Sequence, residues 1–217
     1  MKNQRILAAT PPDWDHELAN YLHVLAGLLD LEMYAQARQF VAELSGAPAP
    51  ELHTPPGRRS EPLLHALLAG KRAAAAERGV TLRLADNATP SRPSVASRDL
   101  VTVLGNLIDN AVDAAAAQPA AKPFAEVGVR AEPGATVLTV ADNGPGVPPA
   151  LRTTVFRMGW STKQAPPHRG RGLGLALVHR ITRRYGGSIR LTERLGGGAV
   201  FTVRLPQEPP MAAGSAL

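Results

Sequence analysis

Two asparagines in one helical segment have the residue type and spacing of a ligand-binding pair. Asn106 and Asn110 are four residues apart, so they share one face of the helix expected at 97–118. Asparagine disfavours helix interiors because its side chain competes for backbone hydrogen bonds. The pair therefore either binds a ligand or is a solvated pair beside Asp109 and Asp113.

A second candidate site lies at the end of the strand expected at 136–141. Asp142 follows this strand, and Gly144 and Gly146 come next. The aspartate places a carboxylate acceptor beside glycine backbone that a flat ring can approach closely. The same residues also suit an ordinary turn, because Asp-Asn-Gly is common in hairpins.

A third candidate is the glycine-rich segment that opens the helix expected at 172–185. Gly170, Gly172 and Gly174 alternate there. Free backbone N–H groups and the positive end of a helix dipole favour phosphate at such a position. The spacing matches neither the Rossmann pattern nor the P-loop pattern, so those two nucleotide-binding folds are unsupported.

Among six histidines, His16 is the best candidate nucleophile. At about 100° per residue it lies opposite the leucine stripe of its helix, so it should project outward. Glu17 follows and can orient the imidazole and take its proton as Nε2 attacks. Asn20 shares this face one turn later. His23 shares it too, but it is followed by Val24 and has no acidic neighbour.

The elements that must position these residues can be read from periodicity. We expect helices at 13–30, 34–44, 61–78, 97–118 and 172–185. We expect strands at 80–85, 126–131, 136–141, 188–193 and 199–205. This order predicts a sheet with helices on one face, an α+β sandwich.

The first two helices form a hairpin that cannot bury its apolar residues alone. The stripe in the first helix consists of Leu18, Leu22, Leu25 and Leu29. We therefore expect two copies of the chain to pair as a four-helix bundle. Prolines and composition divide the chain into an N-terminal segment (1–12), the dimerisation hairpin (13–46), a proline-rich linker (47–60), an α/β domain (61–206) and a flexible tail (207–217).

Composition excludes several classes of protein. The absence of cysteine removes disulfides, thiol nucleophiles and thiolate metal sites. No apolar run approaches the ~18 residues of a spanning helix, so we expect a cytoplasmic chain without membrane insertion. The net charge of +6 would suit nucleic acid, but 4% aromatic residues leave little for base stacking, and we expect no such partner.

In this order, the three motifs resemble the GHKL ATP-binding fold of gyrase, the large heat-shock chaperone, mismatch-repair ATPases and histidine kinases. The segment 155–163 looks like the lid of histidine kinases, and 197–206 looks like the last strand of the family. The resemblance implies that Asp142 accepts a hydrogen bond from the adenine amino group and that Gly144 and Gly146 let the base approach.

The resemblance also implies how phosphates and metal are bound. Asn110 would hold the Mg²⁺ that bridges the ATP phosphates, and Asn106 would contact phosphate or metal. Other implied nucleotide contacts are Lys163 of the lid, Gly170, Gly172, Leu173, Gly174 and Thr202. Some GHKL ATPases have a water-activating glutamate where Asn106 stands. Asparagine cannot take a proton, so the site suits phosphoryl transfer better than hydrolysis.

The segment 16–29 resembles the phosphoacceptor hairpin of the citrate and four-carbon-dicarboxylate sensor kinases. Their pattern is His-Glu-x-x-Asn-x-Leu-His followed by Gly-Leu-Leu, and 62–71 looks like their lead-in helix. The resemblance implies phosphorylation of His16, with Glu17 and Asn20 beside it, and transfer to a response regulator. Such kinases carry a membrane sensor and a PAS domain in front, whereas fifteen residues precede His16. The chain is thus expected to be either a fragment of a membrane sensor or a soluble kinase.

The sequence therefore predicts the catalytic core of a two-component sensor histidine kinase, a homodimer that uses ATP and Mg²⁺. Two alternatives keep part of this machinery. A phosphotransferase would share the His16 hairpin but lack kinase activity. A GHKL serine kinase of the anti-sigma type would keep the nucleotide site but would not need the hairpin.

Overall fold

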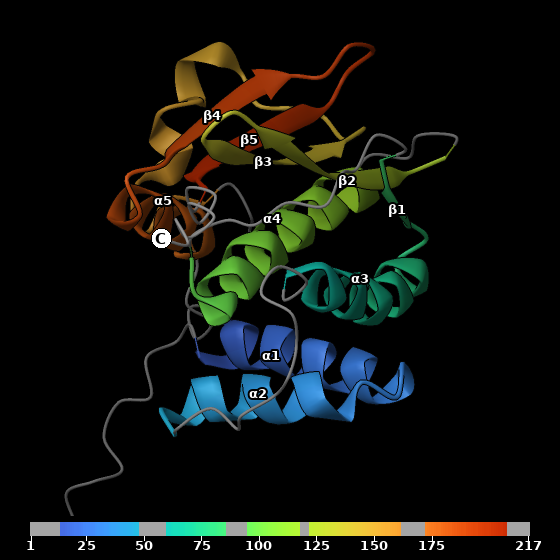
Figure 1. Ribbon diagram of the computed structural model, residues 1–217. Coiled ribbons are helices and arrows are strands. Elements are labelled where there is room, and N and C mark those ends of the chain that lie inside the picture. The colour runs from blue at the N-terminus through green and yellow to red at the C-terminus, as the bar shows by residue number, and fades with distance from the viewer. Residues whose placement is uncertain (1–13, 48–59, 86–94, 118–121, 162–171, 208–217) are drawn as a thin grey trace, which may run out of the picture.

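The structure is a computed structural model that describes residues 14–47, 60–85, 95–117, 122–161 and 172–207. Two helices, α1 (Trp14–Asp30) and α2 (Tyr34–Ser45), lie side by side at one end of the molecule (Figure 1). Gly46 ends α2 because its left-handed φ of 68° lets its N–H donate to the Ala42 carbonyl. The predicted pair of N-terminal helices is thus present in the chain.

A five-stranded sheet forms the opposite end of the molecule, in the order β1-β2-β3-β5-β4. The strands are β1 (Thr81–Leu84), β2 (Phe124–Glu132), β3 (Ala135–Asp142), β4 (Ser188–Glu193) and β5 (Ala199–Pro206). β1 is parallel to β2, and the other neighbouring strands are antiparallel. Along β5 the buried residues alternate with less buried ones, as expected for a sheet with one covered face.

Three helices lie on the covered face, between the sheet and the α1–α2 pair (Figure 1). They are α3 (Ser60–Glu77), α4 (Ser97–Ala117) and α5 (Gly174–Arg184). Among the described residues, α4 alone is long and apolar enough to cross a membrane by length and composition. Most of it is buried against neighbouring elements, which accounts for its apolar character.

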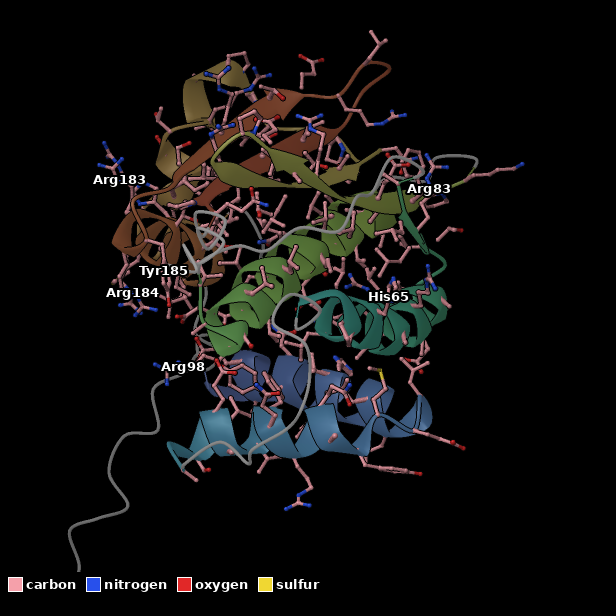
Figure 2. The ribbon with its side chains drawn as sticks, viewed as in Figure 1. His65, Arg83, Arg98, Arg183, Arg184 and Tyr185 are labelled. Atoms are coloured by element: carbon pink, nitrogen blue, oxygen red, sulfur yellow. The ribbon has the colours of Figure 1, made fainter. Side chains whose placement is uncertain are left out.

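Polar contacts fix the end of α5 to the start of α4. The side chains of Arg184 and Tyr185 lie near the first turn of α4, on the side where Arg98 projects (Figure 2). Asp99 accepts from the Arg184 guanidinium and from the Tyr185 hydroxyl, both at 2.6 Å. The Tyr185 hydroxyl also accepts from the Ala96 N–H at 3.3 Å. Part of the basic charge of the chain therefore has a structural use within this domain.

α1 packs on α3 and α4 through small residues. A Cβ added to Gly27 would lie 2.4 Å from the Ala66 carbonyl oxygen, and one added to Gly70 would lie 2.8 Å from the Cβ of His23. Val24 and Leu28 are fully buried and belong to the same apolar core as the helices of the α/β part. The two parts of the chain are therefore joined by a common core.

The orientation of α1 corrects one prediction. The face that carries Asn20 was expected to project outward, but Asn20 is 0% exposed against α4. The close approach that glycines allow makes this face the packing surface. Leu18, Leu22 and Leu29 are 51%, 54% and 51% exposed. Three of the four leucines of the stripe are thus largely exposed, and Leu25 is half-buried against the core.

The remaining elements match the predicted ones to within two residues at most ends. β2 begins at Phe124, two residues earlier than predicted. Two short 3₁₀ helices were missed, η1 (Pro149–Leu151) and η2 (Thr154–Phe156), because three residues give no readable period. The sandwich class itself agrees with the sequence-based prediction.

Candidate functional site

One row of residues on α4 connects the predicted motifs. Asn106, Asn110 and Ala114 follow one another at intervals of four residues, so they lie along one face of the helix. At one end of the row, a Cβ added to Gly174 would lie 2.5 Å from Asn106 Oδ1. At the other end, a Cβ added to Gly144 would lie 2.5 Å from the Ala114 carbonyl oxygen. The start of α5 and the turn after β3 therefore meet the same face of α4, with Asn110 between them.

Asp142 occupies the end of β3 and is 1% exposed. Its Oδ1 accepts hydrogen bonds from the N–H of Gly144 at 2.9 Å and of Ala199 at 3.4 Å. Neither bond uses Oδ2. Burial raises the pKa of Asp142, while the two hydrogen bonds and the Arg194 guanidinium act in the opposite direction. The carboxylate is thus a buried acceptor held in place through one oxygen.

The two glycines after Asp142 are required by neighbouring backbone of the same chain. Gly144 lies against Ala114 of α4, as described above. Gly146 has a left-handed φ of 71°, and a Cβ there would lie 3.0 Å from the Gly198 carbonyl oxygen. These contacts explain both glycines without a ligand. The approach of a flat ring to them stays a prediction.

The two asparagines of α4 are half-buried, so they are not the solvated pair of the alternative interpretation. Asn106 Nδ2 donates to the Thr102 carbonyl at 2.8 Å, which directs Oδ1 toward Gly174. Among the described residues, no group forms a hydrogen bond with the side-chain amide of Asn110. Asn110 is thus the member of the pair whose amide is not engaged by this part of the chain.

Asp109, the residue before Asn110, is held by a buried lysine. Lys71 Nζ lies 2.6 Å and 2.8 Å from the two carboxylate oxygens of Asp109, and Lys71 is only 5% exposed. The ion pair joins α3 to α4 beside the asparagine row. Two hydrogen bonds to one carboxylate fix its geometry, so Asp109 is engaged in structure.

The glycine-rich segment meets the Gly159–Trp160 backbone where α5 begins. The Gly159 N–H donates to the Gly172 carbonyl at 3.0 Å, and Gly172 has a φ of 72°. A Cβ at Gly172 would lie 2.4 Å from the Trp160 carbonyl oxygen. The N-cap of α5, Leu173, makes no side-chain hydrogen bond to the helix, so no side-chain cap covers its first N–H groups. Lys163 and Gly170 lie outside the described residues.

Thr202 is not brought to Asp142, and its assignment to the nucleotide contacts stays a prediction. The strand register pairs Thr202 with Thr139, on the sheet face opposite to that of Asp142. Ala199 is the residue of β5 that reaches Asp142, through its N–H. Sequence reasoning missed Ala199 because a backbone donor has no side-chain signal. The glycine run at 196–198 before it was the available indication.

The predicted phosphoacceptor group lies at the start of α1. The backbone of His16 belongs to the first turn of α1, and its side chain lies outside the described residues. Glu17 is half-buried. Asn20 is packed so tightly that a Cβ at Gly105 would lie 2.3 Å from its Nδ2, and neither amide atom of Asn20 has a hydrogen-bond partner. The structure thus packs Asn20 against Gly105 of α4, the residue that precedes Asn106.

His23 also lies at the contact between α1 and the α/β part. Its Nδ1 is buried without a hydrogen-bond partner. Burial lowers the pKa of His23, and the Lys71 ammonium lowers it further, while Asp109 acts in the opposite direction. A histidine in this environment favours the neutral form. It occupies a packing position, in contrast to the predicted exposed one.

Comparisons with known proteins identify the family of the chain. The family of histidine kinase-, DNA gyrase B- and HSP90-like ATPases matches residues 95–209. Sensor protein CitS of Bacillus subtilis (strain 168) is 34% identical over 195 residues, which cover 89% of this chain and 35% of that protein. Sensor histidine kinase DcuS of Escherichia coli (strain K12) is 33% identical over 195 residues, covering 88% of this chain and 34% of that protein.

A solved structure has a similar fold over most of the described elements. Full-length ShkA, crystallised in complex with AMPPNP, matches 93% of this chain and 45% of its own chain, with a TM-score of 0.58 and 24% sequence identity. At that identity the likeness concerns the fold. The chain spans about a third of the length of the curated relatives above.

Proposed function

Because the chain belongs to the histidine kinase-, DNA gyrase B- and HSP90-like ATPase family, we propose that it is the catalytic core of a two-component sensor histidine kinase. It binds ATP in the α/β part, transfers the γ-phosphoryl group to His16 and then to an aspartate of a response regulator. The observation that carries this proposal is the α4 row, which connects a glycine-rich helix start to the buried carboxylate of Asp142 through Asn106 and Asn110.

The contacts of the described residues fit a nucleotide. Oδ2 of Asp142 is not used by either of its hydrogen bonds, so it can accept from the adenine amino group. The Asn110 amide oxygen is a hard ligand of the kind that Mg²⁺ prefers. When bound, Mg²⁺ neutralises phosphate charge and aligns the γ-phosphate. The uncapped first turn of α5 offers N–H groups to the phosphates, with Gly172, Leu173 and Gly174 at its entrance.

The residues support transfer to a side chain more than transfer to water. Asn106 cannot act as a base, and its Nδ2 is already engaged by the Thr102 carbonyl. In the proposed step, Nε2 of His16 attacks the γ-phosphorus, and the bond to the β,γ-bridging oxygen breaks so that ADP leaves. Glu17 accepts the proton that the imidazole releases. Asn20 lies on the same helix one turn later.

The proposed kinase is a homodimer through α1 and α2 and acts in the cytoplasm as the catalytic part of a sensor. The exposed leucine stripe of α1 supports pairing of two copies. In the described conformation Asn20 is covered by α4. If Asn20 assists the transfer, α1 must separate from α4 during the cycle. This conformation is therefore proposed to precede phosphorylation of the hairpin.

The decisive experiment measures phosphoryl transfer from γ-labelled ATP with Mg²⁺. We expect an acid-labile, alkali-stable phosphoprotein in the wild type, none above background in His16→Gln, and label retained in His23→Gln. His23 is the matched control because it lies seven residues later in the same helix. Label that persists in His16→Gln would contradict the assignment. A wild type that binds no ATP would point to a phosphotransferase, and label appearing only on an added protein serine would point to the serine-kinase alternative.

A further inference from the structure

The turn between β4 and β5 is closed by Arg194. Its N–H donates to the Gly198 carbonyl at 3.1 Å, and its own carbonyl accepts from the Gly197 N–H at 3.0 Å. Its guanidinium Nη1 also donates to the Gly197 carbonyl at 3.2 Å. Gly196, Gly197 and Gly198 have φ values of 87°, 94° and 102°, which only glycine adopts without strain. The shape of this turn therefore depends on Arg194 and three glycines.

The same turn lies directly on the backbone of Asp142. A Cβ at Gly198 would lie 2.0 Å from the Asp142 carbonyl oxygen and 2.9 Å from the Cα of Asn143. The next residue, Ala199, donates its N–H to Asp142 Oδ1. No side chain could be placed between the turn and the end of β3. The position of the carboxylate is thus coupled to the conformation of the turn.

The side chain of Arg194 reaches across the end of β3 to β2. Its guanidinium carbon lies 4.8 Å from the ring centroid of Phe124, the first residue of β2. Because β3 lies between β2 and β5 in the sheet, this cation–π contact spans β3. The Phe124 N–H donates to Asn143 Oδ1 at 2.8 Å, and the Asn143 N–H donates to the Phe124 carbonyl at 3.3 Å. Arg194 therefore links the β4–β5 turn on one side of Asp142 to Phe124 on the other side, and Phe124 holds Asn143, the residue after Asp142.

Arg194 also supplies the charge that acts on Asp142. The neighbours of Asp142 in the sheet are uncharged: Ala125 is its partner on β2, and Ala199 of β5 donates its N–H to the carboxylate. Among the described residues, Arg194 is the charged group that lowers the pKa of Asp142 against the effect of burial. Its guanidinium thus favours the ionised carboxylate, the stronger hydrogen-bond acceptor.

From this geometry we propose that Arg194 is a positioning residue for adenine recognition. By strapping the β4–β5 turn across the end of β3, it holds the Asp142 carboxylate where an exocyclic amino group can donate to it. This inference rests on the proposed role of Asp142 in binding ATP. It assigns a nucleotide-selectivity role to a side chain in a turn that does not itself need to touch the base.

The test compares ATP and GTP affinities, by titration calorimetry, in the wild type, Arg194→Met, Arg194→Lys and a matched control. Arg83→Met is the control because Arg83 also lies over the Phe124 ring, at 4.3 Å, but comes from β1 and forms its ion pair with Glu126 of β2. We expect Arg194→Met to weaken ATP binding about tenfold, with a smaller loss for GTP, which presents a carbonyl where adenine has its amino group. Arg194→Lys should recover part of the loss, and Arg83→Met should bind as the wild type does.

The pH profile separates positioning from simple loss of structure. Without the guanidinium, the pKa of Asp142 should be higher. As the pH is lowered, ATP affinity in Arg194→Met should therefore begin to fall at a higher pH than in the wild type. Equal losses in Arg83→Met and Arg194→Met, or an unchanged pH profile, would overturn the role of Arg194. Wild-type affinity in Asp142→Asn would instead overturn the proposed nucleotide site, and the role of Arg194 with it.

Discussion

At the scale of single residues, Asp142 combines burial with a need for charge. It is almost fully buried, yet the two hydrogen bonds that it accepts from the described residues engage one oxygen, and both come from backbone N–H groups. Burying a carboxylate costs free energy unless hydrogen bonds or opposite charge offset it. Arg194 offsets part of this cost. Burial of this carboxylate costs free energy, and the described residues bond only its Oδ1. This arrangement supports the proposal that a ligand donates to Oδ2.

The cost predicts that Asp142→Asn separates stability from binding. The pKa of Asp142 is raised in the folded state, so the unfolded state loses its proton at a lower pH. Stability attributed to Asp142 therefore decreases as the pH rises through the interval between the two pKa values. Asparagine keeps an acceptor oxygen and does not titrate. Urea unfolding should show Asp142→Asn more stable than the wild type by on the order of 1 kcal/mol at pH 8, and less so at pH 4, while ATP affinity is lost. The same difference at both pH values would contradict this account.

Candidate site residues could be located from the sequence where a side chain marks them and not where only the backbone takes part. Asp142 and the two asparagines of α4 can be recognised in the sequence because a carboxylate and two amides are unusual in apolar segments. The N–H of Ala199 gives no such indication, although it binds Asp142. Thr202 is assigned only through the resemblance of 197–206 to the last strand of the family, and strand alternation turns it to the face opposite to that of Asp142. A shift of one residue along a strand moves a side chain to the other face of the sheet. The strand register decides this, and it is known only once the partner strand is known.

At the scale of elements, periodicity predicted the position of α1 in the sequence but not the helices against which it packs. The leucine stripe lies along one face as predicted, and the face carrying Asn20 is predicted to project outward because it lies opposite that stripe. The structure instead packs that face on α3 and α4, where Gly27, Gly70 and Gly105 let the helices approach closely. Contacts of this kind involve residues far apart in the sequence, so a single-helix pattern cannot reveal them. Short α1 and α2 gain their stability from this tertiary packing.

This packing predicts that Gly27→Ala destabilises the protein. Replacing glycine by alanine inside a helix ordinarily stabilises it by up to ~1 kcal/mol. Here the new Cβ would lie 2.4 Å from the backbone oxygen of Ala66, which no rotamer can relieve. We expect a loss of about 1–3 kcal/mol in the free energy of unfolding, measured in urea. The control is Ala26→Leu, which enlarges the exposed neighbouring residue and should stay within about 0.5 kcal/mol of the wild type. A stabilised Gly27→Ala would show that α1 does not remain packed on α3 in solution.

At the scale of the whole molecule, the chain buries one face of its N-terminal helices and leaves the other exposed. Large apolar side chains of both helices and of the turn between them remain open to solvent: Leu18, Leu22, Leu29, Leu31, Tyr34 and Val41. Scattered exposed leucines are normal on a protein surface, but a stripe at helical spacing within one helix pair favours an interface. The same helices are joined to the nucleotide-binding part by a common core. In the described conformation, pairing of two copies would therefore also place their two α/β parts relative to each other.

The outer face predicts that Leu22→Glu disrupts a homodimer without disrupting the fold. Leu22 is 54% exposed, so a charge there costs little in the monomer, whereas it would be buried between two copies. Light scattering should find the wild type as a dimer and Leu22→Glu as a monomer with unchanged ATP affinity, since the residues that contact Asp142 and the α4 row all come from one chain. Leu195→Glu is the control for the oligomeric state alone, because Leu195 is 97% exposed in the β4–β5 turn, far in sequence from both helices. Leu22→Glu that remains dimeric would show that the exposed stripe is not the interface.

A monomer that still labels His16 at the wild-type rate would show that the transfer occurs within one chain. Such a transfer requires α1 to leave α4 and present His16 to the nucleotide of the same chain.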